Sequence, residues 1–121
     1  MIKRLIATMI LGLLIICPPP VLAEKSGEKT ADAAIVSGGG ALAGIVVLAP
    51  TSGVTLFVYD NASAASGTSL VPTWVIPASS QALHSIGFGV NPVICPYYNG
   101  IYVDIDSTGT VKYEVYYIPT R

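Results

Sequence analysis

From residue 41 onward, apolar and polar side chains alternate with the period of two that places neighbouring residues on opposite faces of a β-strand. The clearest example is the segment 54–59, in which one face carries Val54, Leu56 and Val58 and the other carries Thr55, Phe57 and Tyr59. No later segment carries an apolar stripe at helical spacing. The pattern therefore predicts an all-β domain.

Further segments have the composition of short strands. A β-branched run within 41–49 predicts a buried strand. Pro72 and Pro77 place the segment 70–76 at a sheet edge, because proline donates no ladder hydrogen bond. The other strands are expected at 82–88, around Cys95, at 101–106 and at 110–118.

These strands follow one another at a spacing of about ten residues and number about six to eight, with glycine and proline mostly between them. We therefore expect a small antiparallel β-sandwich, of jelly-roll or immunoglobulin-like type, over residues 41–121. The last two strands flank the turn Asp106–Gly109 and are expected to pair as a C-terminal hairpin.

The first 23 residues have the order of a secretory signal peptide. Lys3 and Arg4 precede an apolar run over 5–16, three prolines follow at 18–20, and Ala23 closes a small-residue cleavage site. The run is too short to cross about 30 Å of hydrocarbon as a stable anchor. Export is therefore expected, to the periplasm, the cell surface or the medium.

Cys17 supports a competing interpretation, because the residues before it resemble a bacterial lipoprotein box. That box requires a small residue directly before the cysteine, and Ile16 is bulky. We therefore prefer the interpretation that a signal peptide is cleaved after Ala23, without lipid attachment. Residues 24–40 are charged or small, without apolar periodicity, and end in three glycines, which predicts a flexible N-terminal arm.

Charge excludes two classes of partner. Charged residues make up 11 % of the chain, less than half the usual share of about 25 %. Residues 24–121 hold four basic and seven acidic side chains, a net charge of −3, and no basic cluster. Binding to nucleic acid or to an anionic membrane surface therefore lacks its main source of affinity.

Residues that carry chemistry are few and isolated. His84 has no nucleophile or carboxylate beside it and is expected on the solvent face of its strand. Cys95 has no positive neighbour that would activate it, so we expect an inert buried thiol, with an intermolecular disulfide as the alternative. The sequence predicts no catalytic residue and no cofactor.

The segment Asp104–Gly109 resembles the start of a calcium-binding loop. Val115 stands where the closing glutamate is required, so the segment is interpreted as a turn, and no metal site is predicted. Asp60 and Asn61 follow the strand 54–59 and are expected to cap the loop after it through backbone amides.

Aromatic residues crowd the C-terminal part of the chain and provide the candidate interaction surface. Because adjacent strand residues point to opposite faces, Tyr116 and Tyr117 cannot both lie in the core. Aromatic side chains are favoured at protein interfaces and also stack on sugar rings. The candidate subunit or ligand surface consists of Trp74, Tyr97, Tyr98, Tyr102, Tyr116 and Tyr117.

One pattern resembles small tailed-phage virion proteins. It consists of Gly44–Val47, a turn, the run Thr55–Ser63 with its Tyr-Asp-Asn motif, and Ser66–Thr68, followed by a C-terminal strand. The resemblance implies a compact β-sandwich that assembles with itself or onto a larger lattice. The export signal and the tyrosine-rich end depart from that pattern, which favours a surface or filament component over a capsid part.

The expected function is that of an exported, non-catalytic structural or interaction protein that self-assembles or decorates a larger surface. The alternative is a secreted carbohydrate- or ligand-binding module that uses exposed tryptophan and tyrosine. Nucleic acid and membrane are not expected as partners.

Overall fold

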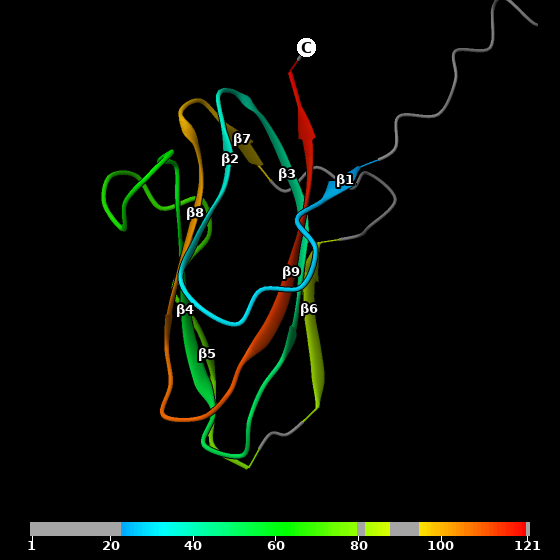
Figure 1. Ribbon diagram of the computed structural model, residues 1–121, viewed down its shortest axis with the longest axis vertical. Helices are drawn as coiled ribbons and strands as arrows, with labels where there is room; N and C mark the ends of the chain where they lie inside the picture. Colours follow the sequence, from blue (N-terminus) through cyan, green and yellow to red (C-terminus); the bar gives the residue numbers. More distant parts are fainter. Residues whose placement is uncertain (1–22, 80–81, 88–94, 121) are drawn as a thin grey trace, which may run out of the picture.

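A computed structural model describes residues 23–79, 82–87 and 95–120 of the chain, and this part is all-β. Two antiparallel sheets pack face to face, which confirms the predicted β-sandwich (Figure 1). The predicted signal peptide lies outside the described residues, apart from Ala23. Within the described ranges, no helix is long and apolar enough to cross a membrane.

Sheet A holds the strands β1 (Glu24–Lys25), β9 (Lys112–Pro119), β3 (Gly40–Leu48) and β6 (Leu83–Gly87) in that order, and β7 (Cys95–Tyr97) pairs with β3 beyond the end of β6. Sheet B holds β2 (Ala33–Ser37), β8 (Gly100–Asp106), β4 (Val54–Tyr59) and β5 (Trp74–Ile76) in that order. In Figure 1 sheet B lies on the left and sheet A on the right.

The pairing is nested from the ends of the chain inward. The strand β1 pairs with β9, β2 pairs with β8, β3 pairs with β6 and β7, and β4 pairs with β5. This is an antiparallel ribbon wound into two sheets, so of the two predicted types the structure has the jelly roll.

The predicted C-terminal hairpin is wrong. The strand β8 pairs with β2 and β4 in sheet B, whereas β9 pairs with β1 and β3 in sheet A. The turn between them, where Ser107 Oγ donates to the carbonyl oxygen of Gly53 at 2.7 Å, carries the chain from one sheet to the other. Alternation identifies the two faces of a strand but does not identify its neighbour.

The predicted flexible arm is also wrong, because residues 24–40 contain β1, β2 and the start of β3. We call residues 24–37 the N-terminal strap, since this segment crosses from the edge of sheet A to the edge of sheet B (Figure 1). Its amides at Ser26 and Lys29 donate to the carbonyl oxygens of Val115 and Tyr113, each at 2.8 Å. Backbone pairing of this kind leaves the side chains free to be charged, so composition does not reveal it.

The core lies between the sheets and is filled from their inward faces. A β-bulge in β3 lets Leu42 and Ile45 both point inward despite their odd spacing, because Ala43 is the extra residue between two paired positions. Gly40 lies against the ring of Tyr97, and a Cβ there would collide with Tyr97 Oη and the carbonyl oxygen of Ile118. The buried core comprises Leu42, Ile45, Val47, Ala49, Val54, Leu56, Val58, Val71, Ile76, Tyr97, Ile101, Val103, Val111, Tyr113 and Val115.

Two of these core residues are tyrosines with different hydroxyl environments. Tyr113 Oη donates to the carbonyl oxygen of Ala31 in the strap at 2.6 Å. Burial raises the pKa of Tyr113, and the nearby Asp32 and Tyr102 raise it further, so the hydroxyl stays protonated as a donor. Tyr97 Oη is buried without a hydrogen-bond partner in the described part of the chain.

This contrast predicts opposite effects for two matched substitutions. Tyr113→Phe leaves the Ala31 carbonyl oxygen without its donor and should lower the free energy of unfolding by about 1 to 3 kcal/mol. Tyr97→Phe removes a hydroxyl that gains nothing on folding and should be neutral or slightly stabilising. Urea unfolding of both variants measures the difference. Equal losses of stability in the two variants would contradict the assigned role of the Tyr113 hydroxyl.

Candidate functional site

The six aromatic candidates do not form one surface. Tyr97 is 1 % exposed and belongs to the core, which corrects its assignment as a surface residue. Trp74 and Tyr117 are half-buried and pack against the core, because their strand positions face inward opposite Leu56 and Leu42. Trp74 is therefore not an open stacking platform.

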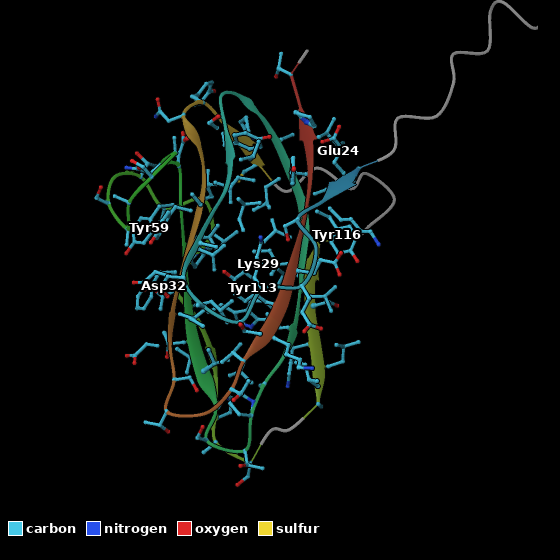
Figure 2. The ribbon with its side chains drawn as sticks, viewed as in Figure 1. Glu24, Lys29, Asp32, Tyr59, Tyr113 and Tyr116 are labelled. Atoms are coloured by element: carbon cyan, nitrogen blue, oxygen red, sulfur yellow. The ribbon has the colours of Figure 1, made fainter. Side chains whose placement is uncertain are left out.

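The other three candidates face outward at separate places. Tyr116 lies on the outer face of sheet A opposite Gly44, so Tyr116 and Tyr117 do point to opposite faces, as predicted. Tyr102 lies on the outer face of sheet B, and Tyr98 is exposed in the turn between β7 and β8. In Figure 2, Tyr116 and the sheet B residue Tyr59 lie on opposite sides of the molecule.

The outer face of sheet B carries aromatic side chains that the candidate set did not include. Tyr59 on β4 lies directly opposite Tyr102 on β8, and Phe57 lies opposite Asp104. All of these side chains are half-buried. We call Phe57, Tyr59 and Tyr102 the aromatic face.

Three carboxylates border this face. Asp32 Oδ1 accepts a hydrogen bond from the amide of Ile105 at 2.8 Å. Burial raises the pKa of the Asp104 carboxyl, and repulsion from the neighbouring Asp32 and Asp106 raises it further. A hydrogen bond that the protonated Asp104 carboxyl donates to Asp32 acts in the same direction. No group of metal-ligating side chains suited to a metal ion occurs among the described residues.

The segment Asp104–Gly109 ends β8 and forms a turn, as predicted. The hydroxyl of Ser107 accepts a hydrogen bond from the amide of Gly109 at 3.2 Å while it donates to Gly53. These two hydrogen bonds hold the backbone of the turn, so the Ser107 hydroxyl has a structural role.

Asp60 caps a turn that is distant in sequence. Its Oδ1 accepts from the amides of Tyr98, Asn99 and Gly100 at 3.0, 2.7 and 3.3 Å. The residue is 9 % exposed. Burial alone raises the pKa of Asp60, but the three amide donors stabilise the carboxylate more strongly, so the pKa lies below its ordinary value. The expected local cap is supplied by Asn61, whose Oδ1 accepts from the amides of Ser63 and Ala64.

His84 and Cys95 are not assembled with the aspartates of the aromatic face. His84 lies opposite Val47 and is half-buried on the inward side of β6, which corrects its expected solvent-facing position. The Sγ atom of Cys95 donates to the carbonyl oxygen of Leu70 at 3.2 Å. Burial raises the pKa of the Cys95 thiol, and the charge of Asp60 raises it further, so the reactive thiolate is disfavoured.

The outer face of sheet A carries exposed apolar side chains. Leu48 on β3 and Leu83 on β6 are cross-strand partners and are 43 % and 70 % exposed. With the half-buried Val46 they form the apolar patch, which borders a shallow depression also lined by Lys112 and Glu114. Surface ion pairs lie beside it, Lys112 with Glu28 at 3.7 Å and Lys25 with Glu114 at 4.0 Å.

The apolar patch extends to an open sheet edge. In the described residues β6 has one neighbour, β3, and lies at the end of sheet A. It contains no aspartate, glutamate, lysine, arginine or proline. Among the described residues no strand pairs with the side of β6 away from β3, and the exposed Leu83 side chain lies beside that edge.

Comparisons of the chain with protein-family models, with curated proteins and with solved structures found no match. The functional argument therefore rests on the geometry of the two outer faces and of the β6 edge.

The sequence allows only a partial prediction of the aromatic face and of the apolar patch. The face formed by Thr55, Phe57 and Tyr59 was visible in the alternation, but its pairing with Tyr102 depends on which strands are neighbours. Leu48 ends an apolar run that predicts complete burial, and nothing in that run marks it as outward-facing.

The Asp60 cap predicts a pH-dependent loss of stability. Because its folded pKa is lowered, the carboxylate stabilises the fold above the unfolded aspartate pKa near 3.9, and this contribution is lost as the pH falls through the folded pKa. Asp60→Asn should cost about 1.5 to 3 kcal/mol at neutral pH. The gap from the unsubstituted protein should narrow below about pH 4.

Urea unfolding as a function of pH tests this prediction. Asp106→Asn, which alters an exposed carboxylate at the end of β8, is the matched control and should stay close to the unsubstituted protein at neutral pH. An Asp60→Asn gap that is constant from neutral to acid pH would show that the amide cap does not depend on the carboxylate charge.

Proposed function

We propose that this protein is an exported, non-catalytic interaction protein that assembles with further copies of itself through the β6 side of sheet A. Its place of action is the periplasm, the cell surface or the medium. The observation that carries the proposal is the exposed Leu48–Leu83 pair beside β6, which pairs with β3 alone among the described strands.

The physical argument concerns exposed apolar area. A single exposed leucine is ordinary, but Leu83 is 70 % exposed and continues into Leu48 and Val46 on the next strand. Water is excluded from these side chains only if another surface covers them, and burial of a leucine contributes roughly 1.5 to 3 kcal/mol. The adjoining edge can add hydrogen bonds that orient the covering chain.

Two other edge strands are better protected than β6, whereas β2 at the end of sheet B also has five residues without charge or proline. The strand β5 at the end of sheet B is only three residues long and lies between Pro72 and Pro77. The strand β1 at the other end of sheet A is two residues long. Short length and proline are the usual devices that prevent edge-to-edge association, and β6 has neither proline nor charge.

Leu83→Lys should abolish self-association of the protein, purified from its host cell after any signal peptide has been removed. Loss of roughly 1.5 kcal/mol from each copy weakens a dimer by about 100-fold, since each 1.4 kcal/mol is a factor of ten. Val75→Lys is the matched control, because Val75 is 61 % exposed on the edge strand of the other sheet. Sedimentation velocity over a wide concentration range measures both variants.

Two outcomes contradict the proposal. The unsubstituted protein would stay monomeric at every concentration if no assembly surface exists. Val75→Lys would weaken association as much as Leu83→Lys if the assembly surface lies on sheet B.

A second candidate function is carbohydrate binding by the aromatic face. The observation that favours it is the direct pairing of Tyr59 with Tyr102, with Phe57 beside them and Asp104 opposite Phe57. Aromatic rings present apolar area to the faces of sugar rings, and carboxylates accept hydrogen bonds from hydroxyl groups. The surface differs from the predicted one, since Trp74 faces the core.

For this candidate, Tyr102→Ala should remove binding to any glycan that the protein recognises on an array. Tyr98→Ala, which alters an exposed tyrosine of a distant turn, should preserve it. A thermal melt of each variant confirms folding. An array without any bound glycan, or equal loss in both folded variants, would eliminate the aromatic face as a sugar platform.

A further inference from the structure

The turn that leads from β7 into β8 contains a chemically reactive pair, Asn99 followed by Gly100. In such a pair the backbone nitrogen of the glycine can attack the side-chain amide of the asparagine, because glycine has no side chain that obstructs the approach. The Asn99 side chain is exposed and therefore in contact with water. The turn thus holds the reactants for loss of the Asn99 amide group.

The fold itself requires the glycine of this pair. Gly100 has a φ of 153°, a conformation that other residues rarely adopt. A Cβ atom there would collide with the carbonyl oxygen of Val36 and lie 2.9 Å from the Cα of Ala62. The packing of β8 against β2 and against the loop after β4 therefore fixes a glycine directly after Asn99.

The carboxylate of Asp60 restrains the nitrogen that would attack. Its Oδ1 accepts hydrogen bonds from the amides of Asn99 at 2.7 Å and of Gly100 at 3.3 Å. The carbonyl oxygen of Asn99 accepts a third hydrogen bond, from the amide of Gly38 at 3.0 Å. While these bonds last, the Gly100 nitrogen is held toward Asp60 and the backbone around Asn99 cannot turn to close a ring.

The charge of Asp60 opposes the same reaction. The Gly100 nitrogen must lose its proton before it attacks, and the resulting negative nitrogen would face a carboxylate. Burial raises the pKa of Asp60, but its amide donors lower the pKa more, so this carboxylate is ionised at neutral pH and is a weak base. Asp60 therefore both repels the reactive form of the nitrogen and is unsuited to remove its proton.

We propose that Asn99 is a site of self-modification controlled by Asp60, which preserves Asn99 while it caps the turn and allows its irreversible conversion to aspartate or isoaspartate when the cap opens. The inference goes beyond the proposed function and does not depend on self-association. It rests on the position of both amides of the pair at one carboxylate.

The conversion consumes water and releases ammonia, with no change of oxidation state. The Gly100 nitrogen forms a bond to the Asn99 Cγ atom, the bond from Cγ to Nδ2 breaks, and Nδ2 leaves as ammonia with the proton that the Gly100 nitrogen gave up. Water then opens the cyclic imide at either of its two carbonyl carbons. Opening at Cγ yields aspartate, and opening at the backbone carbonyl carbon yields isoaspartate.

Either product weakens the cap that had prevented its formation. A new carboxylate at position 99 lies beside Asp60 and repels it. Isoaspartate also lengthens the backbone by a carbon atom, which displaces the amides that Asp60 accepts from and the carbonyl oxygen that Gly38 donates to. Conversion therefore marks permanently those molecules in which the turn between β7 and β8 has opened.

Mass spectrometry of peptides after incubation in heavy-oxygen water measures conversion at Asn99. The folded, unsubstituted protein should convert at least about tenfold more slowly than the same protein unfolded in urea, because modification then requires a local opening. Asp60→Ala should convert at least about tenfold faster than the unsubstituted protein, because the restraint on both amides is lost. Asn99→Gln in the Asp60→Ala background should remove the signal and so confirm the site.

Tyr113→Phe is the matched control for a general loss of stability, because it removes a hydrogen bond outside the turn. It should convert at nearly the rate of the unsubstituted protein. Circular dichroism at the assay temperature confirms that each variant is folded. If Asp60→Ala has no folded state, the isosteric Asp60→Asn replaces it, and sequencing of the peptides separates conversion at position 60 from conversion at Asn99.

Two results would overturn the proposal. The folded, unsubstituted protein would convert as fast as in urea if the cap gave Asn99 no protection. The folded Asp60 variant would convert no faster than Tyr113→Phe if the protection came from the fold as a whole. Neither result bears on self-association, so the failure of this inference is distinguishable from the failure of the proposed function.

Discussion

The fold depends on pairing between the first and last strands of the described chain. The strap reaches β9 through β1 and the Lys29–Tyr113 bridge, and it reaches β8 through β2 (Figure 2). The hydroxyl of Tyr113 adds a bond to Ala31 from inside the core. Because these contacts join residues that are far apart in sequence, sheet B is not complete until β8 has been added and sheet A is not complete until β9 has been added. High contact order of this kind slows folding.

The same topology explains why one side of the sandwich is closed and another is open. The strap covers the side where sheets A and B end in β1 and β2. The opposite ends are β6 and β5, and only β5 is short and bordered by prolines on both sides. The proposed self-association through β6 would use an edge that has no second neighbour among the described residues.

Sequence reasoning identified the faces of strands well and their neighbours poorly. The alternation in Val54–Tyr59 predicted which side chains share a face, and the structure buries the face of Val54, Leu56 and Val58. It could not predict that β8 and β9 belong to different sheets, because alternation carries no information about pairing partners. The strap was missed because its backbone makes the pairing bonds, and Tyr97 was misplaced because its three-residue strand is too short to show a period. The site surfaces depend on pairing, so Leu83 and the aromatic face needed the structure.

Amide hydrogen exchange at Ser26, Lys29 and Tyr113 is the most direct test of this account. The amide of Ser26 donates to Val115 at 2.8 Å, and the amides of Lys29 and Tyr113 donate to each other's carbonyl oxygens at 2.8 and 2.9 Å. If the strap is part of the fold, the amides of Ser26 and Lys29 are protected from exchange. When Tyr113→Phe removes the hydrogen bond to Ala31, these two amides should lose protection together with the amide of residue 113. Exchange of Ser26 and Lys29 at the rate of an unfolded peptide, beside a protected β9, would contradict the nested pairing on which the open β6 edge depends.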